Sequence, residues 1–319
     1  MARGEPVGFN GTMIRFGLCC LFTEEPIRFR TTTAKALAGR ERQAQLCALS
    51  ALCLANAENL RLALQAVQRR GIGAFRVTSP LFPRFTHPEV GYTLADLPEA
   101  AEIAAVLGQV REFGRKHHIR LSLHPDQFVV LSSPRAEVVA NARRELEYHG
   151  FLAEQIGAEV ITLHAGGGYG DKGAALARFA AAFATLSDGV QQRLALENDD
   201  HTYAPADLLP LCKELGIPFV YDVHHHRCLP DTLSVEEASQ RAAASWQRLG
   251  REPWFHLSSP KNGWQGGDPK PHADCIDPAD FPACWQELGC DVTVDVEAKA
   301  KELAVVRLMA ALGARPIRG

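Results

Sequence analysis

Short apolar runs alternate with longer, helix-like segments along the whole chain. The β-prone runs are Ile14–Cys19, Ala74–Val77, Ile119–Leu123, Val160–Leu163, Leu194–Leu196, Phe219–Tyr221, Trp254–Leu257 and Val292–Val296. The segments of helical composition are Ala34–Arg70, Leu97–His117, Ala136–Ile156, Lys172–Leu186, Pro205–Leu215, Val235–Leu249, Asp280–Leu288 and Lys299–Leu312. Four of these segments end in a glycine just before the next strand, as helices often do, because glycine enters the left-handed region without a Cβ clash.

This alternation predicts an α/β fold, a single (β/α)8 TIM barrel. A doubly wound open sheet is the alternative, but eight near-regular units and the lack of a G-x-G-x-x-G sequence argue against it. No internal repeat or low-complexity linker divides the chain. We therefore expect a flexible N-terminal tail over residues 1–12 and one barrel domain over residues 13–319. Within the barrel, the Gly-, Pro- and Lys-rich stretch Ser258–His272 predicts a long surface loop.

Composition narrows the class of protein. The chain has 319 residues, of which 46% are hydrophobic and 22% charged, as in globular proteins, so collagen, coiled coil and disorder are excluded. No apolar run approaches ~18 residues and no signal peptide opens the chain, so neither a membrane span nor secretion is expected. Nine cysteines without a C-x-x-C pair indicate a reduced, cytoplasmic protein. The net charge of -3 neither indicates nor excludes a nucleic-acid partner.

The metal-capable side chains fall at the ends of the predicted strands. In a parallel barrel all these ends open onto one face, where catalytic residues gather. The six side chains at strand ends are His124, His164, Glu197, Asp222, His256 and Glu297. His87, His225 and His272 lie in loops that follow such strands and could join them. The sequence therefore predicts one site built from distant segments.

The ligand types indicate the chemistry. A lone histidine is usually a surface or core residue, but nine metal-capable residues on one face are hard to attribute to packing, since buried charge is costly unless paired or coordinated. Imidazole and carboxylate without thiolate favour Mn²⁺, Zn²⁺ or Fe²⁺. Nine ligands exceed the needs of one ion, so we expect two or three. Such a site suits hydrolysis of a phosphodiester, because metals activate water and stabilise the attacking and departing oxygens.

Two further motifs are less specific. The glycine-rich segment from Ala165 to Lys172 enters a helix, and it is either a phosphate-binding loop or a tight turn that passes close to the metals. In the triple histidine that begins at His224, spacing from Asp222 favours His225 as the ligand; His224 is expected to point away, and His226 is left open.

Five motifs together resemble the UV damage endonuclease family. They are HPDQF at His124–Phe128, LHAGGGYGDKG at Leu163–Gly173, LEND at Leu196–Asp199, YDVHHH at Tyr221–His226 and VEAKAK at Val296–Lys301. The resemblance runs from about Ile14 to Leu303. It implies a TIM barrel related to endonuclease IV that binds a cluster of divalent metals, typically manganese. It also implies nicking of duplex DNA immediately 5′ to ultraviolet photoproducts, which leaves a 3′-hydroxyl and a 5′-phosphate.

The same resemblance assigns site residues and shows where this sequence departs from the family. All nine residues above match family metal ligands. Gln127 and Phe128 stand where the family has a glutamine and a tyrosine that probe the DNA at the lesion. Besides this loss of a hydroxyl at Phe128, Leu18 replaces a tyrosine, and Trp254 replaces a lysine two residues before the histidine of the seventh strand. The metal ligands are thus complete, whereas the residues that read the lesion are altered.

We therefore predict a divalent-metal-dependent endonuclease of DNA repair, acting on damaged double-stranded DNA as a monomer. Glu197, Glu297, Asp222 and His256 would carry catalysis, and Gln127, Phe128 and Lys261 would contact the substrate. One alternative is a metal-dependent small-molecule enzyme on the same barrel, a sugar isomerase or an iron-dependent oxidase. Another is a lesion-binding or scaffold protein without catalysis, which the complete ligand set disfavours.

Overall fold

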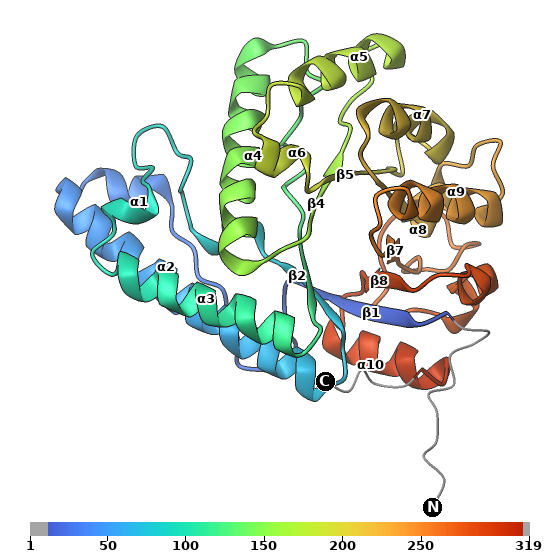
Figure 1. The fold of residues 1–319 in the computed structure, drawn as a ribbon, viewed down its shortest axis with the longest axis horizontal. Helices are drawn as coiled ribbons and strands as arrows, with labels where there is room; N and C mark the ends of the chain where they lie inside the picture. The colour runs from blue at the N-terminus through green and yellow to red at the C-terminus, as the bar shows by residue number, and fades with distance from the viewer. Residues whose placement is uncertain (1–11, 315–319) are drawn as a thin grey trace, which may run out of the picture.

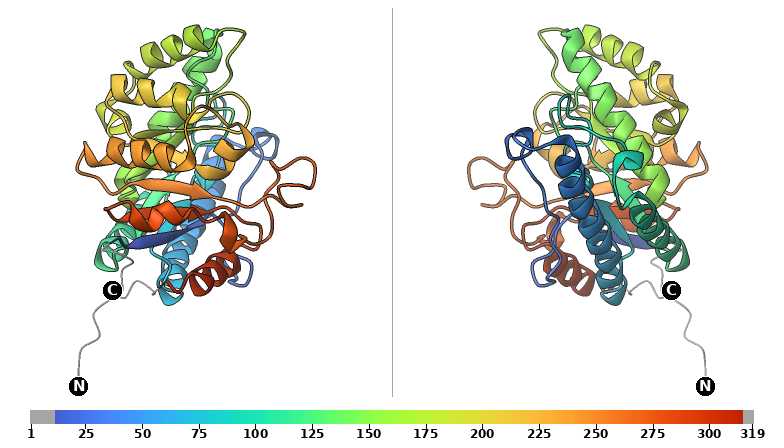
Figure 2. Two further views of the ribbon diagram at one scale, coloured as in Figure 1. Left: turned by 90° about the vertical axis from the view of Figure 1, so that its right-hand side faces the viewer. Right: turned by 90° about the vertical axis from the view of Figure 1, so that its left-hand side faces the viewer.

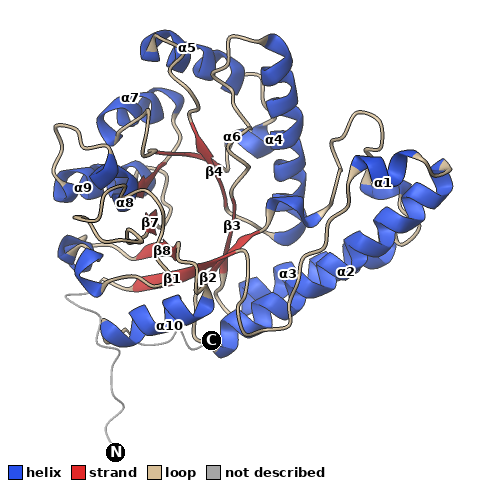
Figure 3. Ribbon diagram, turned by 180° about the vertical axis from the view of Figure 1, so that it is seen from behind, coloured by secondary structure: helices blue, strands red, loops and turns tan. Residues whose placement is uncertain are grey.

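Eight parallel strands close into one barrel in the order of the chain (Figures 1 and 3). The structure is a computed structural model that describes residues 12–314. The strands are β1 (Ile14–Cys19), β2 (Ala74–Val77), β3 (Arg120–Leu123), β4 (Val160–His164), β5 (Leu194–Glu197), β6 (Phe219–Asp222), β7 (Trp254–Leu257) and β8 (Val292–Val296). β8 pairs with β1 and completes the closure. The predicted single (β/α)8 barrel is confirmed, and the open sheet is excluded.

Helices cover the outside of this barrel, as two views at right angles to Figure 1 show (Figure 2). They are α1 (Ala34–Ala38), α2 (Arg42–Arg69), α3 (Ala100–Lys116), α4 (Ala136–Ile156), α5 (Lys172–Phe183), α6 (Asp188–Gln191), α7 (Pro205–Leu215), α8 (Val223–Cys228), α9 (Val235–Gln247) and α10 (Glu302–Ala311). Four 3-10 turns, η1 (Ser79–Leu81), η2 (Leu94–Asp96), η3 (Pro278–Asp280) and η4 (Ala283–Glu287), lie in the loops. Gly157 and Gly216 end α4 and α7 in the left-handed region, as predicted.

Three helix predictions need correction. The first predicted helix is two, because α1 ends at a C-cap, Gly39, and α2 starts only at Arg42. The predicted helix at 280–288 is instead the pair of 3-10 turns η3 and η4; Pro282, which has no N–H to donate, separates them. α8 was not predicted. It starts directly after β6 because the Asp222 side chain accepts a hydrogen bond from the backbone N–H of His225 and so caps the helix.

Inside the barrel, the half near the strands' N-terminal ends is filled and tied together. Successive side chains of a strand alternate between its two faces, so Trp254 faces inward on the same side of β7 as His256. Its buried ring shares a cluster with the small side chains of Ala74 and Ala195, and the Arg120 guanidinium lies 4.5 Å from the ring centroid. Glu252 pairs with Arg120 at 3.3 Å. The open end of the barrel is therefore the C-terminal one.

Two expectations concern the ends of the chain and membranes. The predicted tail, residues 1–12, lies outside the described residues except for Thr12, which is buried. Between residues 12 and 314, no helix combines the length and the apolar character that a bilayer span requires.

Candidate metal centre

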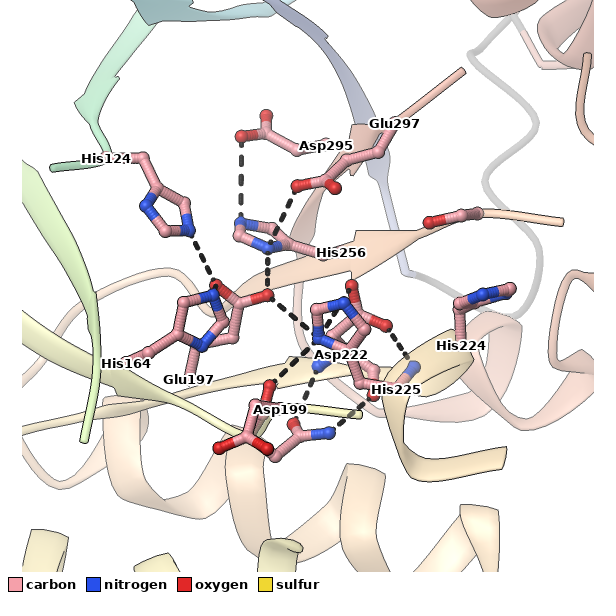
Figure 4. Close-up of polar contacts among 12 residues, drawn as sticks. His124, His164, Glu197, Asp199, Asp222, His224, His225, His256, Asp295 and Glu297 are labelled. Atoms are coloured by element: carbon pink, nitrogen blue, oxygen red, sulfur yellow. Dashed lines mark hydrogen bonds and ion pairs between the residues drawn. The ribbon is translucent and has the colours of Figure 1, made fainter. Parts of the chain in front are cut away.

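Strand alternation brings six of the predicted ligands together at the C-terminal end of the barrel. They come from or directly follow six consecutive strands: His124, His164, Glu197, Asp222, His256 and Glu297. Figure 4 shows their side chains converging on the space around the Glu197 carboxylate. The structure thus places these six side chains, which are far apart in the sequence, close to one another.

Glu197 is the centre of this arrangement. It is 1% exposed at the end of β5, and each of its oxygens faces two imidazoles. Its Oε2 lies 2.9 Å from His124 Nε2 and 3.6 Å from His164 Nε2. Its Oε1 lies 2.8 Å from His256 Nδ1 and 3.5 Å from His225 Nδ1. No other described residue belongs to both of the metal-capable groups that form here.

The first group is His124, His164 and Glu197, and the second is Glu197, Asp222, His256 and Glu297. In each group the ligand atoms lie within 4.8 Å of one another. Asp222 is buried, and its Oδ2 has no hydrogen-bond partner, which leaves a carboxylate oxygen free for a cation. Three buried or half-buried carboxylates so close together would repel one another without positive charge between them. The residues present therefore fit divalent ions with nitrogen and oxygen ligands.

Electrostatics keep these carboxylates in the charged form that a metal needs. Burial alone would raise the pKa of Glu197, but His256 and His164 outweigh it and hold that pKa well below its usual range. The Arg76 guanidinium, 2.6 Å from Glu297, similarly overcomes burial and lowers the pKa of Glu297. At neutral pH both glutamates are therefore anionic.

The remaining predicted ligands lie outside the two groups. His225, on α8, donates from Nδ1 to the backbone carbonyl of Asn198 at 3.0 Å, which leaves its other ring nitrogen as the ligand-capable atom. His272 Nδ1 lies 3.8 Å from Glu297 Oε2. His87 is not part of either group; its Nδ1 accepts hydrogen bonds from the backbone amides of Glu89 and Val90. These three residues stay predicted metal ligands.

The predicted substrate-contacting residues lie in exposed loops. Gln127 and Phe128 are exposed between β3 and α4, and Phe128 is 78% exposed. Lys261 is exposed in the long loop after β7, whose ends are joined by a bridge between Pro260 and His272. Leu18, by contrast, is fully buried in the main core, so it cannot take part in a contact with a ligand.

The two less specific motifs now have structures. Gly166, at φ +86°, packs so closely that a Cβ would lie 2.5 Å from the Val130 side chain, which agrees with a tight turn. His226 bonds the Tyr221 hydroxyl at 2.7 Å and Asp231 at 3.1 Å, so its two ring nitrogens are already engaged. His224, expected to point away, is fully buried, with its ring centroid 5.3 Å from that of His272.

Sequence reasoning missed two residues beside the centre. Arg76, on β2, contacts Glu297, His256 and Asp295. Asp295, on β8, is fully buried and lies beside His256 (Figure 4). One signal for Asp295 was available: it stands two residues before Glu297 on a strand, so both side chains point into the barrel.

Comparison with known proteins gives consistent matches over nearly the whole chain. The model of the family described as UV-endonuclease UvdE matches residues 14–317. A UV DNA damage endonuclease of Bacillus velezensis is 35% identical, covering 96% of both chains. One of Deinococcus radiodurans is 36% identical and covers 93% of this chain and 95% of its own.

Among solved structures, SacUVDE aligns with a TM-score of 0.81 at 27% identity, covering 95% of this chain and all of that one. Endonuclease IV of Thermus thermophilus aligns with a TM-score of 0.59 at 16% identity, covering 94% and 100%. A D-psicose 3-epimerase of Clostridium cellulolyticum aligns with a TM-score of 0.55 at 12% identity, covering 94% and 97%. At such identities the last two matches establish a shared barrel fold and nothing about the reaction.

Proposed function

The chain belongs to the UV-endonuclease UvdE family, and from this premise we propose that it is a divalent-metal-dependent endonuclease of DNA repair that nicks damaged duplex DNA 5′ to ultraviolet photoproducts or related lesions. The observation that carries the metal dependence is Glu197, whose two oxygens face separate sets of ligands. One carboxylate placed in this way can bridge two ions.

The predicted ligands would hold two or three divalent ions, which we propose to be Mn²⁺. His124, His164 and Glu197 would hold one, and Glu197, Asp222, His256 and Glu297 another. His225 and His272, whose ring centroids lie 6.5 Å apart, are the ligands proposed for a third ion, and His87, in the loop after β2, remains a proposed ligand of the cluster. Divalent ions in such a site activate water for attack at phosphorus and stabilise charge on the departing oxygen.

The protein's own side chains would place the DNA against this centre. Phe128 projects its ring into solvent beside the open end of the barrel, and a stacked aromatic ring contributes ~1–3 kcal/mol per base. Gln127, its neighbour, offers an amide that can donate and accept hydrogen bonds to a base edge. Lys261 would contact a phosphate as a point charge.

The decisive experiment is nicking of an end-labelled duplex that carries one pyrimidine photoproduct, with Mn²⁺ added and with EDTA as the control. Undamaged and abasic duplexes are tested in parallel. We expect a cut just 5′ of the photoproduct with Mn²⁺ and none with EDTA. Cutting of the abasic duplex alone would identify abasic DNA, and not photoproducts, as the substrate. If folded, metal-loaded protein cuts no duplex, the proposal is overturned in favour of a small-molecule substrate. We expect the protein to elute from gel filtration as a monomer.

A further inference from the structure

Tyr169, in the glycine-rich segment from Ala165 to Lys172, is a half-exposed aromatic residue with no part in the function so far. We propose that it is a second DNA-stacking residue: its ring stacks on a nucleobase of the bound duplex, and Arg178 beside it binds a neighbouring phosphate. This inference rests on the proposed endonuclease function and adds to it a contact that neither the metal ligands nor the loop after β3 supplies.

The position of Tyr169 on the barrel parallels that of Phe128. Among the described residues, these two aromatic side chains remain largely exposed, at 50% and 78%. Each follows a ligand of the first metal-capable group, Phe128 four residues after His124 and Tyr169 five residues after His164. Because β3 and β4 are parallel neighbours, the loops after them lie at the same, C-terminal end of the barrel. Tyr169 therefore lies at the end where a substrate must approach the metals.

The two loops that carry these rings are joined by hydrogen bonds. Ser132, in the loop after β3, donates from Oγ to the backbone carbonyl of Ala165 at 2.6 Å. Arg178, on α5, donates from Nε to the backbone carbonyl of Ser132 at 2.8 Å. A duplex that contacts Phe128 on one loop therefore meets a second loop, with Tyr169, in a fixed position beside it.

The ring of Tyr169 is held in place although it is exposed. Its φ is +48°, in the left-handed region that residues other than glycine rarely adopt. The ring lies against the backbone of Gly167, where a Cβ would come 3.4 Å from Tyr169 Cζ. The Asp171 amide closes the turn by donating to the Gly168 carbonyl at 2.9 Å. A ring fixed in this way loses little conformational freedom when it binds, so its stacking contributes nearly in full to affinity.

Arg178 supplies a positive charge next to this ring. Its guanidinium carbon lies 5.7 Å from the ring centroid of Tyr169, and within residues 12–314 it forms no ion pair with a carboxylate. Lys172, at the start of the same helix, is by contrast paired with Asp207 at 2.9 Å. The bond to Ser132 engages Nε of Arg178, which leaves the two Nη groups as donors for a phosphate.

The first test measures the Kd for a duplex that carries one photoproduct, by fluorescence anisotropy at fixed salt. Tyr169→Ala should bind about 5- to 150-fold more weakly, the usual effect of losing one stacked ring. Tyr169→Phe keeps the ring and should bind within about twofold of the native protein. Leu249→Ala, which removes an exposed apolar side chain between α9 and β7, is the matched control and should bind like the native protein.

A double variant tests whether Tyr169 and Phe128 stack on different bases. Since the rings lie on separate loops, the losses in affinity of Phe128→Ala and Tyr169→Ala should multiply when the two substitutions are combined. A combined loss no larger than that of either single variant would show that both rings serve one contact, and it would overturn a second stacking residue.

The salt dependence of binding tests the phosphate contact of Arg178. The slope of log K against log salt concentration should fall by about 1 in Arg178→Gln, as for the loss of one neutralised phosphate. Arg178→Lys keeps the charge and should keep the native slope. Arg111→Gln is the matched control, because Arg111 on α3 also bonds a backbone carbonyl, that of Glu154, but near the opposite end of the barrel. An unchanged slope in Arg178→Gln would overturn the phosphate contact.

The outcomes separate this inference from the proposed function. Native protein that neither binds nor nicks any duplex would refute the function and this inference with it. Native protein that nicks, with Tyr169→Ala binding as tightly as the native protein, would leave the function standing and remove the role of Tyr169. If circular dichroism shows that Tyr169→Ala does not fold, Tyr169→Leu replaces it, because leucine packs against Gly167 without an aromatic face and should bind as weakly as expected for alanine.

Discussion

Replacing Phe128 with alanine tests whether the exposed loop after β3 reads DNA. The ring is 78% exposed, so it contributes little to the folded state, and the substitution should change the free energy of unfolding by less than about 0.5 kcal/mol. The loop beneath it is held in place: Asp126 accepts from the N–H of Phe128 at 3.1 Å and, through its backbone carbonyl, from Val129 at 2.9 Å. The ring is therefore presented on an ordered turn.

Stacking sets the expected size of the effect. If the ring stacks on one base, its loss costs ~1–3 kcal/mol, which corresponds to about 5- to 150-fold weaker binding of a damaged duplex. Phe128→Tyr keeps the ring and should bind within about twofold of the native protein or better, since a hydroxyl adds a further hydrogen-bonding group. The change should appear in the Kd and KM for damaged DNA, whereas the metal content stays unchanged because the side chain does not belong to either ligand group.

The assay is fluorescence anisotropy with a duplex that carries one photoproduct, at fixed salt because phosphate contacts make affinity depend on it. Leu249→Ala is the matched control: it also removes an exposed apolar side chain, but from the segment after α9. Equal Kd values for native protein, Phe128→Ala and Leu249→Ala would refute the role of the ring. Weaker binding together with a lower unfolding free energy would instead indicate that the ring supports the fold.

Three further predictions follow from the contacts above. Glu197→Gln should lose two ions and Glu297→Gln one, as counted by mass spectrometry of metals after desalting. Nicking should fall more than about 100-fold in both variants. An unchanged metal content in Glu197→Gln would contradict the role of Glu197 as a ligand of both ions. Burial lowers the pKa of His149 to about 4, so below about pH 6.5 the unfolded state binds more protons than the folded state. The free energy of unfolding therefore decreases as the pH is lowered. When urea unfolding is measured at pH 7 and at pH 5, His149→Gln should lose about 2 kcal/mol less of this free energy than the native protein. Gly17→Ala should lower the unfolding free energy by about 1–3 kcal/mol, because its methyl group would overlap Asp295; an unchanged urea midpoint would argue that the carboxylate moves aside freely.

The barrel could be predicted from the sequence because its signals are local. Each strand is a short apolar run, and several helices end at a glycine, so the alternation of elements is visible without knowing any long-range contact. The breaks in the corrected helices also have local causes, namely the C-cap at Gly39 and the ring of Pro282. The apolar pattern of the sequence continues across both positions, so it does not reveal these breaks. Hydrophobic periodicity alone does not register where a backbone donor is missing.

The site could be predicted only as far as one rule of the fold reaches. In a parallel barrel the strand ends converge, so residues at those ends meet, and His124, Glu197 and Glu297 do. The rule gives no information about loops, whose paths depend on their own turns. His87 illustrates this limit, since the amides of its own loop occupy one of its ring nitrogens.

The residues that sequence reasoning missed lie within strands and not at their ends. Arg76 and Asp295 carry charge inside a strand, where side chains of apolar runs are expected to be apolar, and neither stands at a strand end. A buried charge is tolerated only when it is paired or coordinated, and Arg76 and Asp295 form an ion pair with each other. Their presence beside the ligands agrees with the charge that the ligands themselves bring, because Glu297 also needs a cation and Arg76 provides it. In this barrel, the two charged residues inside strands β2 and β8 therefore belong to the surroundings of the candidate metal centre.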